Sequence, residues 1–318
     1  MQQLLLTGRR LPFSLAHCLQ SGQTFAWRPV CGFWMGTVCR TAYAVRQVGD
    51  RLEYIASRKH LTSTQVLEDY FALDENYREI MNHFPKDPFL QKALRFSAGL
   101  RILRQDPWEC LAGFILSSTK QIVHIQQIWR KVSERWGNPI ALGRGWPLLY
   151  TFPGPEVLRC CSEHSLRTCG MGFRAPYLIA AAREVDTGDL NLHSLRQMAT
   201  EEARARLMKL KGVGRKIADC VLLFSLGKRE AFPMDTWILR VLRYTYFHGE
   251  LHIVPRRLLQ FATQYFGVYG GYAQQCLFHY ARMNPKKGGW YYDKKDPLTS
   301  DALRVNNQED EGFSYRGY

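Results

Sequence analysis

The segment Leu210–Lys216, which reads LKGVGRK, decides the fold of this chain. Two glycines one residue apart permit a tight turn and a close approach of the backbone to a ligand. The helix expected after the turn begins with unpaired N–H groups at the positive end of its dipole, which suits a phosphate. We therefore predict two helices joined by a hairpin whose Gly212, Val213 and Gly214 contact the DNA backbone. Taken alone, the glycines would equally suit a plain turn between helices.

Two charged residues turn this hairpin into a candidate active site. Lys216 lies in the first turn of the second helix, where the dipole disfavours a charged amine. Only a neutral amine is nucleophilic. Asp235 follows 19 residues later, after a proline, and can cap the next helix. Singly, Lys216 could be a solvated lysine and Asp235 a mere cap; jointly with the hairpin, we interpret them as a catalytic pair.

The composition supports a polyanionic partner. Among 318 residues, 43 are Lys or Arg and 28 are Asp or Glu, which gives a formal net charge of +15. The basic residues are dispersed along the chain, so the charge is expected to cover a folded surface. A basic protein without such a partner would have the same composition. A length of 318 residues fits two domains or one large domain.

The nine cysteines show no regular framework and are odd in number, which predicts reduced thiols in an intracellular protein. No leader peptide and no run of about 18 apolar residues is found, so no membrane span is expected. An iron–sulfur cluster needs four closely spaced cysteines, whereas only Cys276 follows Asp235. Cys160, Cys161 and Cys169 do not form a zinc set. We expect no metal and no cofactor.

The periodicity of apolar residues predicts an α+β fold. Alternation at 23–28, 33–38, 42–46 and 51–55 predicts an antiparallel β domain with flanking helices over residues 1–100. A mostly α-helical domain is expected over 101–283, and a polar, partly disordered tail over 284–318. Asp106-Pro107 marks the start of one helix. Further helices are expected near 155–161, 174–185, 200–210, 215–226, 236–246, 255–266 and 272–282.

The segment from Leu210 to Asp235 resembles the helix-hairpin-helix, Gly/Pro-rich loop and aspartate signature of the base-excision DNA glycosylase superfamily. In that superfamily, the lysine marks members that are both glycosylases and abasic-site lyases. Monofunctional relatives keep the aspartate and lack the lysine. The resemblance therefore implies a bifunctional enzyme with Lys216 as its nucleophile.

Four further stretches resemble the 8-oxoguanine DNA glycosylase family: Ser21–Trp27, Leu103–Leu111, Ala218–Cys220 and Tyr272–Phe278. Together with the hairpin they span roughly residues 20 to 282. The resemblance implies an N-terminal antiparallel β domain packed on a helical glycosylase domain. It also implies that the substrate is double-stranded DNA containing 8-oxoguanine.

The same resemblance assigns roles in a pocket for the flipped base. The Gly22 carbonyl would accept the N7 hydrogen that 8-oxoguanine has and guanine lacks. Cys220 and Phe278 would sandwich the base, and Gln274 would bond its Watson–Crick edge. Without the resemblance, Gly22 would be a turn glycine, Cys220 and Phe278 core residues, and Gln274 a residue of a helix surface.

The chain departs from the animal-type family pattern where the opposite strand is read. An Asn run of that pattern is Thr119-Lys120-Gln121 here, His124 matches an arginine, and Phe173 replaces a tyrosine. We therefore predict relaxed selectivity for the base opposite the lesion. A family histidine two residues after the aspartate is Trp237. The DNA contacts expected outside the hairpin are Thr119, Lys120, Gln121, His124, Phe173 and Arg174.

The sequence thus predicts a monomeric DNA glycosylase and abasic-site lyase that excises 8-oxoguanine through a lysine Schiff base and contacts no membrane. It would associate with DNA in the nucleus of a eukaryote, or in the cytoplasm and nucleoid of a prokaryote. One alternative is another glycosylase of the same superfamily. The other is a non-catalytic helix-hairpin-helix protein that only binds DNA, in which Lys216 and Asp235 would be incidental.

Overall fold

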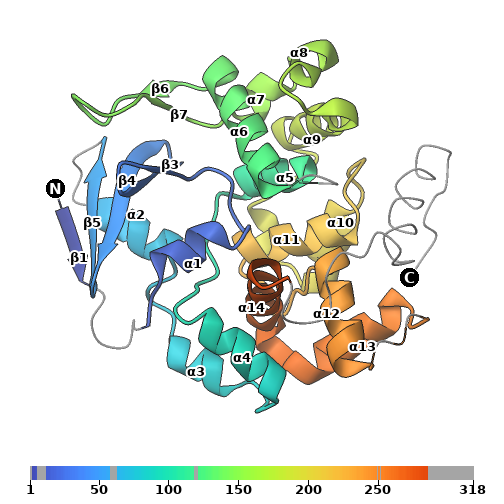
Figure 1. Ribbon diagram of the computed structural model, residues 1–318. Helices are drawn as coiled ribbons and strands as arrows, with labels where there is room; N and C mark the ends of the chain where they lie inside the picture. The colour runs from blue at the N-terminus through green and yellow to red at the C-terminus, as the bar shows by residue number, and fades with distance from the viewer. Residues whose placement is uncertain are drawn as a thin grey trace.

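The computed structural model describes residues 2–5, 12–57, 63–117, 121–248, 250 and 252–285, and its fold is α+β, as predicted (Figure 1). Thr119 and Lys120 lie outside the described residues, and so does the predicted tail beyond residue 285. No helix in the described part of the chain combines the length and the apolar character that crossing a membrane requires.

The N-terminal part is an antiparallel five-stranded sheet with the strand order β1-β5-β4-β3-β2. Its central pairing aligns Met35 with Ala44 and Val45 with Tyr54. Helices α1 and α2 cover one face, where they share a core with β4 and β5. A second, two-stranded sheet covers the other face, and Trp146 in its connecting loop packs edge-on against Phe33. The strands are β1 (Gln2–Leu5), β2 (Arg28–Val30), β3 (Phe33–Val38), β4 (Thr41–Val48), β5 (Arg51–Ala56), β6 (Pro139–Ile140) and β7 (Leu149–Tyr150), and the two helices are α1 (Leu15–Gln20) and α2 (Ser63–Tyr70).

The predicted strand over 23–28 was wrong, because the chain forms a loop there until β2 begins at Arg28. The side chain of Gln23 is fully buried and replaces the expected backbone ladder with its own hydrogen bonds. Its amide Nε2 donates to the Cys18 carbonyl at 3.0 Å and to the Arg101 carbonyl at 2.9 Å. Its Oε1 accepts from the Leu103 N–H at 2.9 Å. Neither β1 nor α1 was predicted from the sequence.

Most of the remaining helices lie where they were predicted, whereas α4 and α8 were not predicted and the helix expected over 155–161 ends at Leu158. Asp106 caps α5 by accepting a hydrogen bond from the Glu109 N–H at 3.0 Å, as its position before Pro107 predicted. The helices are α3 (Tyr77–Asn82), α4 (Pro88–Phe96), α5 (Pro107–Leu116), α6 (Ile122–Trp136), α7 (Pro155–Leu158), α8 (Glu163–Arg167), α9 (Ala175–Asp186), α10 (Thr200–Leu207), α11 (Arg215–Ser225), α12 (Thr236–Tyr246), α13 (Pro255–Phe266) and α14 (Gly270–Met283), with 3-10 turns η2 (Gly172–Arg174), η3 (Ser194–Arg196) and η4 (Gly267–Tyr269).

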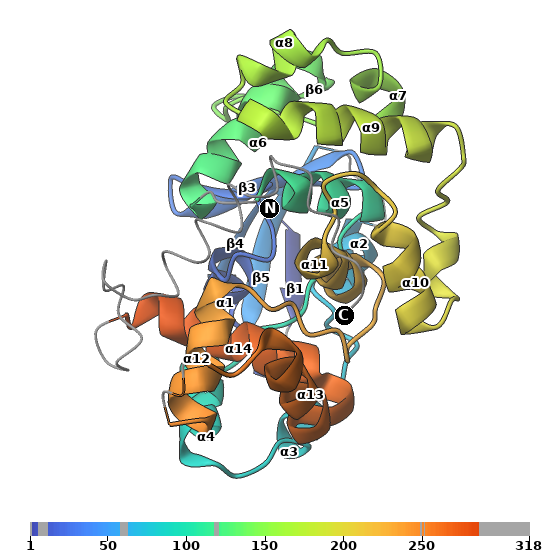
Figure 2. The same ribbon diagram turned by 90° about the vertical axis from the view of Figure 1, so that its right-hand side faces the viewer.

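Figures 1 and 2 show these helices in two groups, α5–α9 on one side and α12–α14 on the other, with α11 between them. Helix α11 is buried from Ile217 to Ser225, and Phe224 stacks on Phe114 of α5 with ring centroids 5.4 Å apart. One hydrophobic core joins both groups and also takes in Tyr77 of α3 and Leu90 of α4. The division of the chain near residue 100 stays a prediction. The burial of α11 gives any group on its first turn a rigid support.

Candidate active site

The predicted hairpin lies between α10 and α11. Gly212 has a φ of +79°, and a Cβ atom there would come within 2.4 Å of the Tyr177 ring in α9. Glycine is therefore required both by the backbone conformation and by the close approach. Val213 is buried and its N–H donates to the Leu210 carbonyl at 3.1 Å. Gly214 is exposed at the N-terminus of α11, and no side-chain hydrogen bond caps that helix.

A buried ion pair ties the two hairpin helices together. The Arg204 guanidinium of α10 lies 2.6 Å from the Asp219 carboxylate of α11, and their side chains are 6% and 2% exposed. Arg215 approaches the second Asp219 oxygen at 3.7 Å. Burial raises the pKa of Asp219 to about 6, although the charge on Arg204 opposes that rise. The pair fixes the angle at which α11 leaves the hairpin.

Lys216 is half-buried in the first turn of α11 and points toward the end of α5. Its Nζ donates a hydrogen bond to the Ser117 hydroxyl at 3.2 Å and lies 5.2 Å from the centroid of the Phe114 ring. Ser117 is the C-cap residue of α5. Sequence reasoning missed this partner, because the two residues are 99 positions apart and a lone serine after a helix carries no signal of such a contact.

Asp235 caps α12, as predicted, by accepting a hydrogen bond from the Ile238 N–H at 2.9 Å. Burial raises the pKa of this carboxyl, while the Ile238 hydrogen bond and the charge on Lys216 oppose the rise. The carboxylate is thus held against a helix N-terminus within the electrostatic reach of the lysine. Such a group can stabilise positive charge that develops beside it.

Cys220 lies one turn after Lys216 on α11 and is 2% exposed. Burial raises the pKa of its thiol to about 12; the charge on Lys216 lowers that pKa and the charge on Asp235 raises it. Cys220 therefore lies within the electrostatic reach of both Lys216 and Asp235. At neutral pH the thiol stays protonated and offers an uncharged wall.

The structure brings Gly22 next to Phe278, although they lie at opposite ends of the chain. Gly22 has a φ of +84°, and a Cβ atom there would lie 3.3 Å from the Phe278 ring and 2.7 Å from the Ile122 side chain. A side chain at this position would therefore fill the space beside the Phe278 ring. Phe278 itself is only partly buried.

Hydrogen bonds hold the Gly22 loop on both sides. Gln275 of α14 donates from Nε2 to the Ser21 carbonyl at 2.8 Å. Gln105 donates from Nε2 to the Gln23 carbonyl at 2.7 Å. The loop is therefore fastened both to α14 and to the segment that leads into α5.

Gln274 lies on α14 one turn before Phe278, so the two side chains share a helix face. Its side chain is 4% exposed, and its Oε1 is buried without a hydrogen-bond partner among the described residues. An unpaired buried amide oxygen costs about 1–3 kcal/mol. This oxygen is therefore available to accept a hydrogen bond.

The residues expected at the opposite strand differ in exposure. Gln121 and His124 are exposed at the start of α6. Phe173 is 47% exposed in η2. Arg174 is 3% exposed; its guanidinium carbon lies 4.2 Å from the Phe173 ring centroid, and its Nη1 donates to the Met171 carbonyl at 3.2 Å.

Two further predictions concern Trp237, in the first turn of α12, and the absence of a metal site. Trp237, which stands where the family pattern has a histidine, is half-buried and packs against the main core. Among the residues that the structure describes, no three His, Cys, Asp or Glu side chains gather as a metal site would require.

The hairpin, the lysine and the capping aspartate define a class. Two family models match the chain: one described as 8-oxoguanine DNA glycosylase, N-terminal domain, over residues 5–111, and one described as HhH-GPD superfamily base excision DNA repair protein, over residues 112–261. The class is therefore that of the helix-hairpin-helix base-excision DNA glycosylases. The chain belongs to the 8-oxoguanine DNA glycosylase family of this class, as predicted, and is a DNA glycosylase with abasic-site lyase activity.

Individual relatives agree with this assignment. A probable N-glycosylase/DNA lyase of Methanothermobacter thermautotrophicus is 32% identical over 253 residues, which cover 73% of this chain and 74% of the relative. The structure of MBOgg1 in complex with a low-affinity DNA ligand superposes with a TM-score of 0.83 at 36% identity, covering 89% of this chain and 96% of that one. The Clostridium acetobutylicum 8-oxoguanine glycosylase/lyase, with duplex DNA containing cytosine opposite 8-oxoguanine, superposes with a TM-score of 0.80 at 33% identity, covering 86% and 93%.

Proposed function

We propose that this chain excises 8-oxoguanine from duplex DNA and cleaves the resulting abasic site through a Schiff base on Lys216. One arrangement carries the proposal: Lys216 and the buried Cys220 lie one turn apart at the start of the hairpin helix, and the Asp235 cap of α12 lies within electrostatic reach of both. The glycine loop and α14 supply the base pocket of the proposed site. The proposed partner is double-stranded DNA, which a monomer would bend and hold with the flipped base in that pocket.

The Gly22 loop supports recognition of the oxidised base. The carbonyls of Ser21 and Gln23 are both occupied by glutamine side chains. In the part of the chain that the structure describes, no donor reaches the Gly22 carbonyl between them. This carbonyl would accept a hydrogen bond from N7–H of 8-oxoguanine, whereas guanine presents a lone pair at N7 and would leave the carbonyl unpaired.

The rest of the proposed pocket reads and holds the flipped base. The buried Gln274 Oε1 would accept from a donor on the Watson–Crick edge, which removes the cost of leaving it unpaired. The Phe278 ring and the protonated Cys220 thiol would cover the two faces of the base.

The proposed chemistry begins with the neutral Lys216 amine. Its nitrogen bonds to C1′ of the sugar while the N-glycosidic bond breaks and the base leaves with the bonding electrons. Opening of the sugar ring gives the Schiff base, and loss of a proton from C2′ then expels the 3′ phosphate by β-elimination. Asp235 would stabilise the positive charge that develops on the sugar in the first step.

The DNA contacts follow from the exposed groups. The uncapped N–H groups at Gly214 would bind a phosphate together with Gly212 and Val213. Phe173 is suited to act as an apolar wedge in the base stack. Thr119, Lys120, Gln121 and His124 would fill the gap and face the opposite base.

Relaxed selectivity for that opposite base is part of the proposal. The only arginine of the expected type, Arg174, is buried against Phe173 rather than exposed for readout. Excision with cytosine, thymine, guanine or adenine opposite the lesion should therefore differ by less than about tenfold, or about 1.4 kcal/mol. A preference for cytosine well above that value would contradict relaxed selectivity and leave the excision itself unaffected.

Borohydride trapping tests the catalytic role. The wild-type protein, incubated with duplex DNA carrying 8-oxoguanine, should give a covalent adduct that is absent from Lys216→Gln. Lys131→Gln is the matched control, because Lys131 is an exposed lysine of α6. An active wild type that yields no adduct, or an adduct that persists in Lys216→Gln, would refute the Schiff-base mechanism.

A further inference from the structure

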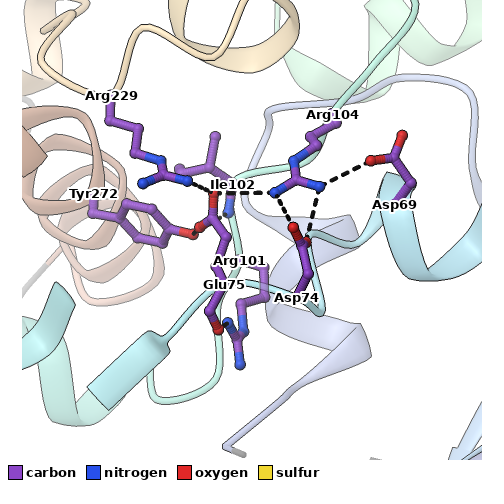
Figure 3. A network of polar contacts seen from close by, with 8 residues as sticks. All are labelled: Asp69, Asp74, Glu75, Arg101, Ile102, Arg104, Arg229 and Tyr272. Carbon is purple, nitrogen blue, oxygen red and sulfur yellow. Dashed lines mark hydrogen bonds and ion pairs between the residues drawn. The ribbon is translucent and has the colours of Figure 1, made fainter. Parts of the chain in front are cut away.

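Outside the active site, a network of polar contacts centres on Glu75, in the turn between α2 and α3 (Figure 3). Its side chain is 7% exposed. One carboxylate oxygen accepts a hydrogen bond from the Tyr272 hydroxyl at 2.5 Å. The other accepts from Arg229 Nη2 at 2.6 Å and lies 3.6 Å from Arg104. A buried carboxylate with such partners fixes the position of each donor.

Both close donors belong to elements that carry the proposed site. Tyr272 is in α14, two residues before Gln274 and on the same helix as Phe278. Arg229 lies in the segment that joins α11, which carries Lys216, to the Asp235 cap of α12. Glu75 therefore contacts the base-pocket helix and the segment before the catalytic carboxyl at once.

These two elements are also fastened to each other. The Arg229 carbonyl accepts a hydrogen bond from the Gly271 N–H at 2.8 Å. A Cβ atom at Gly271 would lie only 2.2 Å from the Leu223 side chain of α11, so the start of α14 sits directly on α11. The side chain and the main chain of Arg229 thus set the start of α14 together.

Glu75 is itself anchored from behind. Its backbone carbonyl accepts from Arg101 Nη1 at 3.0 Å, and the Arg101 guanidinium is fully buried over the Tyr77 ring, 4.6 Å from its centroid. The Tyr272 hydroxyl, in addition to its bond to Glu75, accepts from the Ile102 N–H at 3.3 Å. The carboxylate is therefore a fixed point against which α14 is aligned.

We propose that Glu75 is a positioning residue for recognition of the damaged base, acting through Tyr272 on α14. This inference rests on the proposed function, since it assumes that Gln274 and Phe278 hold the flipped base. Lys216 is held separately, by Ser117 and by the Arg204–Asp219 pair at the hairpin. Loss of the Glu75 contacts should therefore impair excision of the base more than cleavage of a preformed abasic site, which needs the lysine but no base.

The test compares these two rates under single-turnover conditions in Glu75→Gln and Tyr272→Phe. A small misplacement of binding groups costs roughly 10- to 100-fold in rate, which is the loss expected for excision of 8-oxoguanine. Cleavage of abasic-site DNA should stay within about threefold of wild type, since a factor of three is only about 0.7 kcal/mol. Asp69→Asn is the control: its carboxylate is 70% exposed and pairs with Arg104 at the rim of the cluster. It should leave both rates unchanged.

Equal losses in both rates would mean that Glu75 contributes only to the overall stability of the protein. Unchanged excision would mean that Glu75 neither stabilises the protein nor positions the base pocket. Either result overturns the inference. If Glu75→Gln does not fold, Tyr272→Phe decides, because phenylalanine keeps the ring and removes only the hydroxyl. A folded wild type with no action on 8-oxoguanine would refute the proposed function, and the inference with it. An active wild type whose variants lose both rates equally refutes the inference alone.

Discussion

Gly22 shows how much a single residue can decide in this site. A methyl group there would meet Phe278 and Ile122 and would also strain a backbone with a φ of +84°. We expect Gly22→Ala to lower single-turnover excision of 8-oxoguanine by roughly 100-fold, because the base would be displaced from the pocket. Cleavage of abasic-site DNA should change little.

Gly32→Ala separates strain from crowding. Gly32 has a φ of +78° in a turn with no atom near its missing Cβ. The strain in Gly32→Ala should lower the free energy of unfolding by about 1 kcal/mol, as the strain in Gly22→Ala should, but Gly32→Ala should excise 8-oxoguanine at the wild-type rate. Equal excision by the two variants would mean that the Gly22 position does not border the bound base.

The Glu109 carboxyl should make the stability of the protein depend on pH. Burial, and next the charge on Asp106, raise its pKa from 4.5 to about 8. A carboxyl with a higher pKa in the folded chain binds its proton more tightly there, so its stabilisation is complete below pH about 4.5 and is lost as the pH rises through about 8. The urea midpoint of the wild type should be lower at pH about 8 than at pH about 5. This difference should be smaller in Glu109→Gln. Glu109→Gln should keep a smaller decrease in midpoint, which comes from Asp219. A decrease as large as that of the wild type would contradict the assignment to Glu109.

At the scale of elements, the Arg204–Asp219 pair should set the stability of the hairpin. Asp219→Ala removes the buried carboxylate and leaves the Arg204 guanidinium with only the exposed Glu201 as an ionic partner, which costs up to roughly 3–5 kcal/mol. The exposed Arg130–Glu134 pair on α6 is the comparison, and its loss should cost less than about 1 kcal/mol. Urea unfolding measures both. Similar small losses at the two sites would show that α10 and α11 are held by apolar packing alone.

The elements also show what a sequence can and cannot predict. The hairpin and helices α9 to α14 follow from local signals, namely the apolar periodicity, Pro and Asp at helix starts, and paired glycines at a turn. The strand expected over 23–28 was wrong, because Gln23 bonds to Arg101 and Leu103, far along the chain.

The missed site contacts are all long-range. Lys216 with Ser117 and Glu75 with Tyr272 join residues 99 and 197 positions apart. Each depends on how helices pack against one another, which no local pattern encodes. The proposed pocket residues were named through motifs that resemble a family, whereas no motif pointed to the residues proposed to position them.

At the scale of the whole molecule, the net charge of +15 and the backbone N–H groups of the hairpin contribute differently to DNA binding. Helix N–H groups bind a phosphate without carrying full charge, so the salt dependence of binding must come from lysine and arginine side chains. Lys209 and Lys211 are exposed beside the hairpin. Each should replace about one counterion on DNA.

Replacing either lysine by glutamine should therefore weaken binding to undamaged and damaged duplexes alike, and should make the slope of log affinity against log salt shallower by about 1. Arg51→Gln is the control, because β5 lies on the opposite side of the molecule from α10 (Figure 1). Fluorescence anisotropy over a salt series gives the slopes. An unchanged slope for both lysine variants would mean that DNA binds to a different face from the hairpin. Lys216 would then be too far from the DNA to attack the sugar.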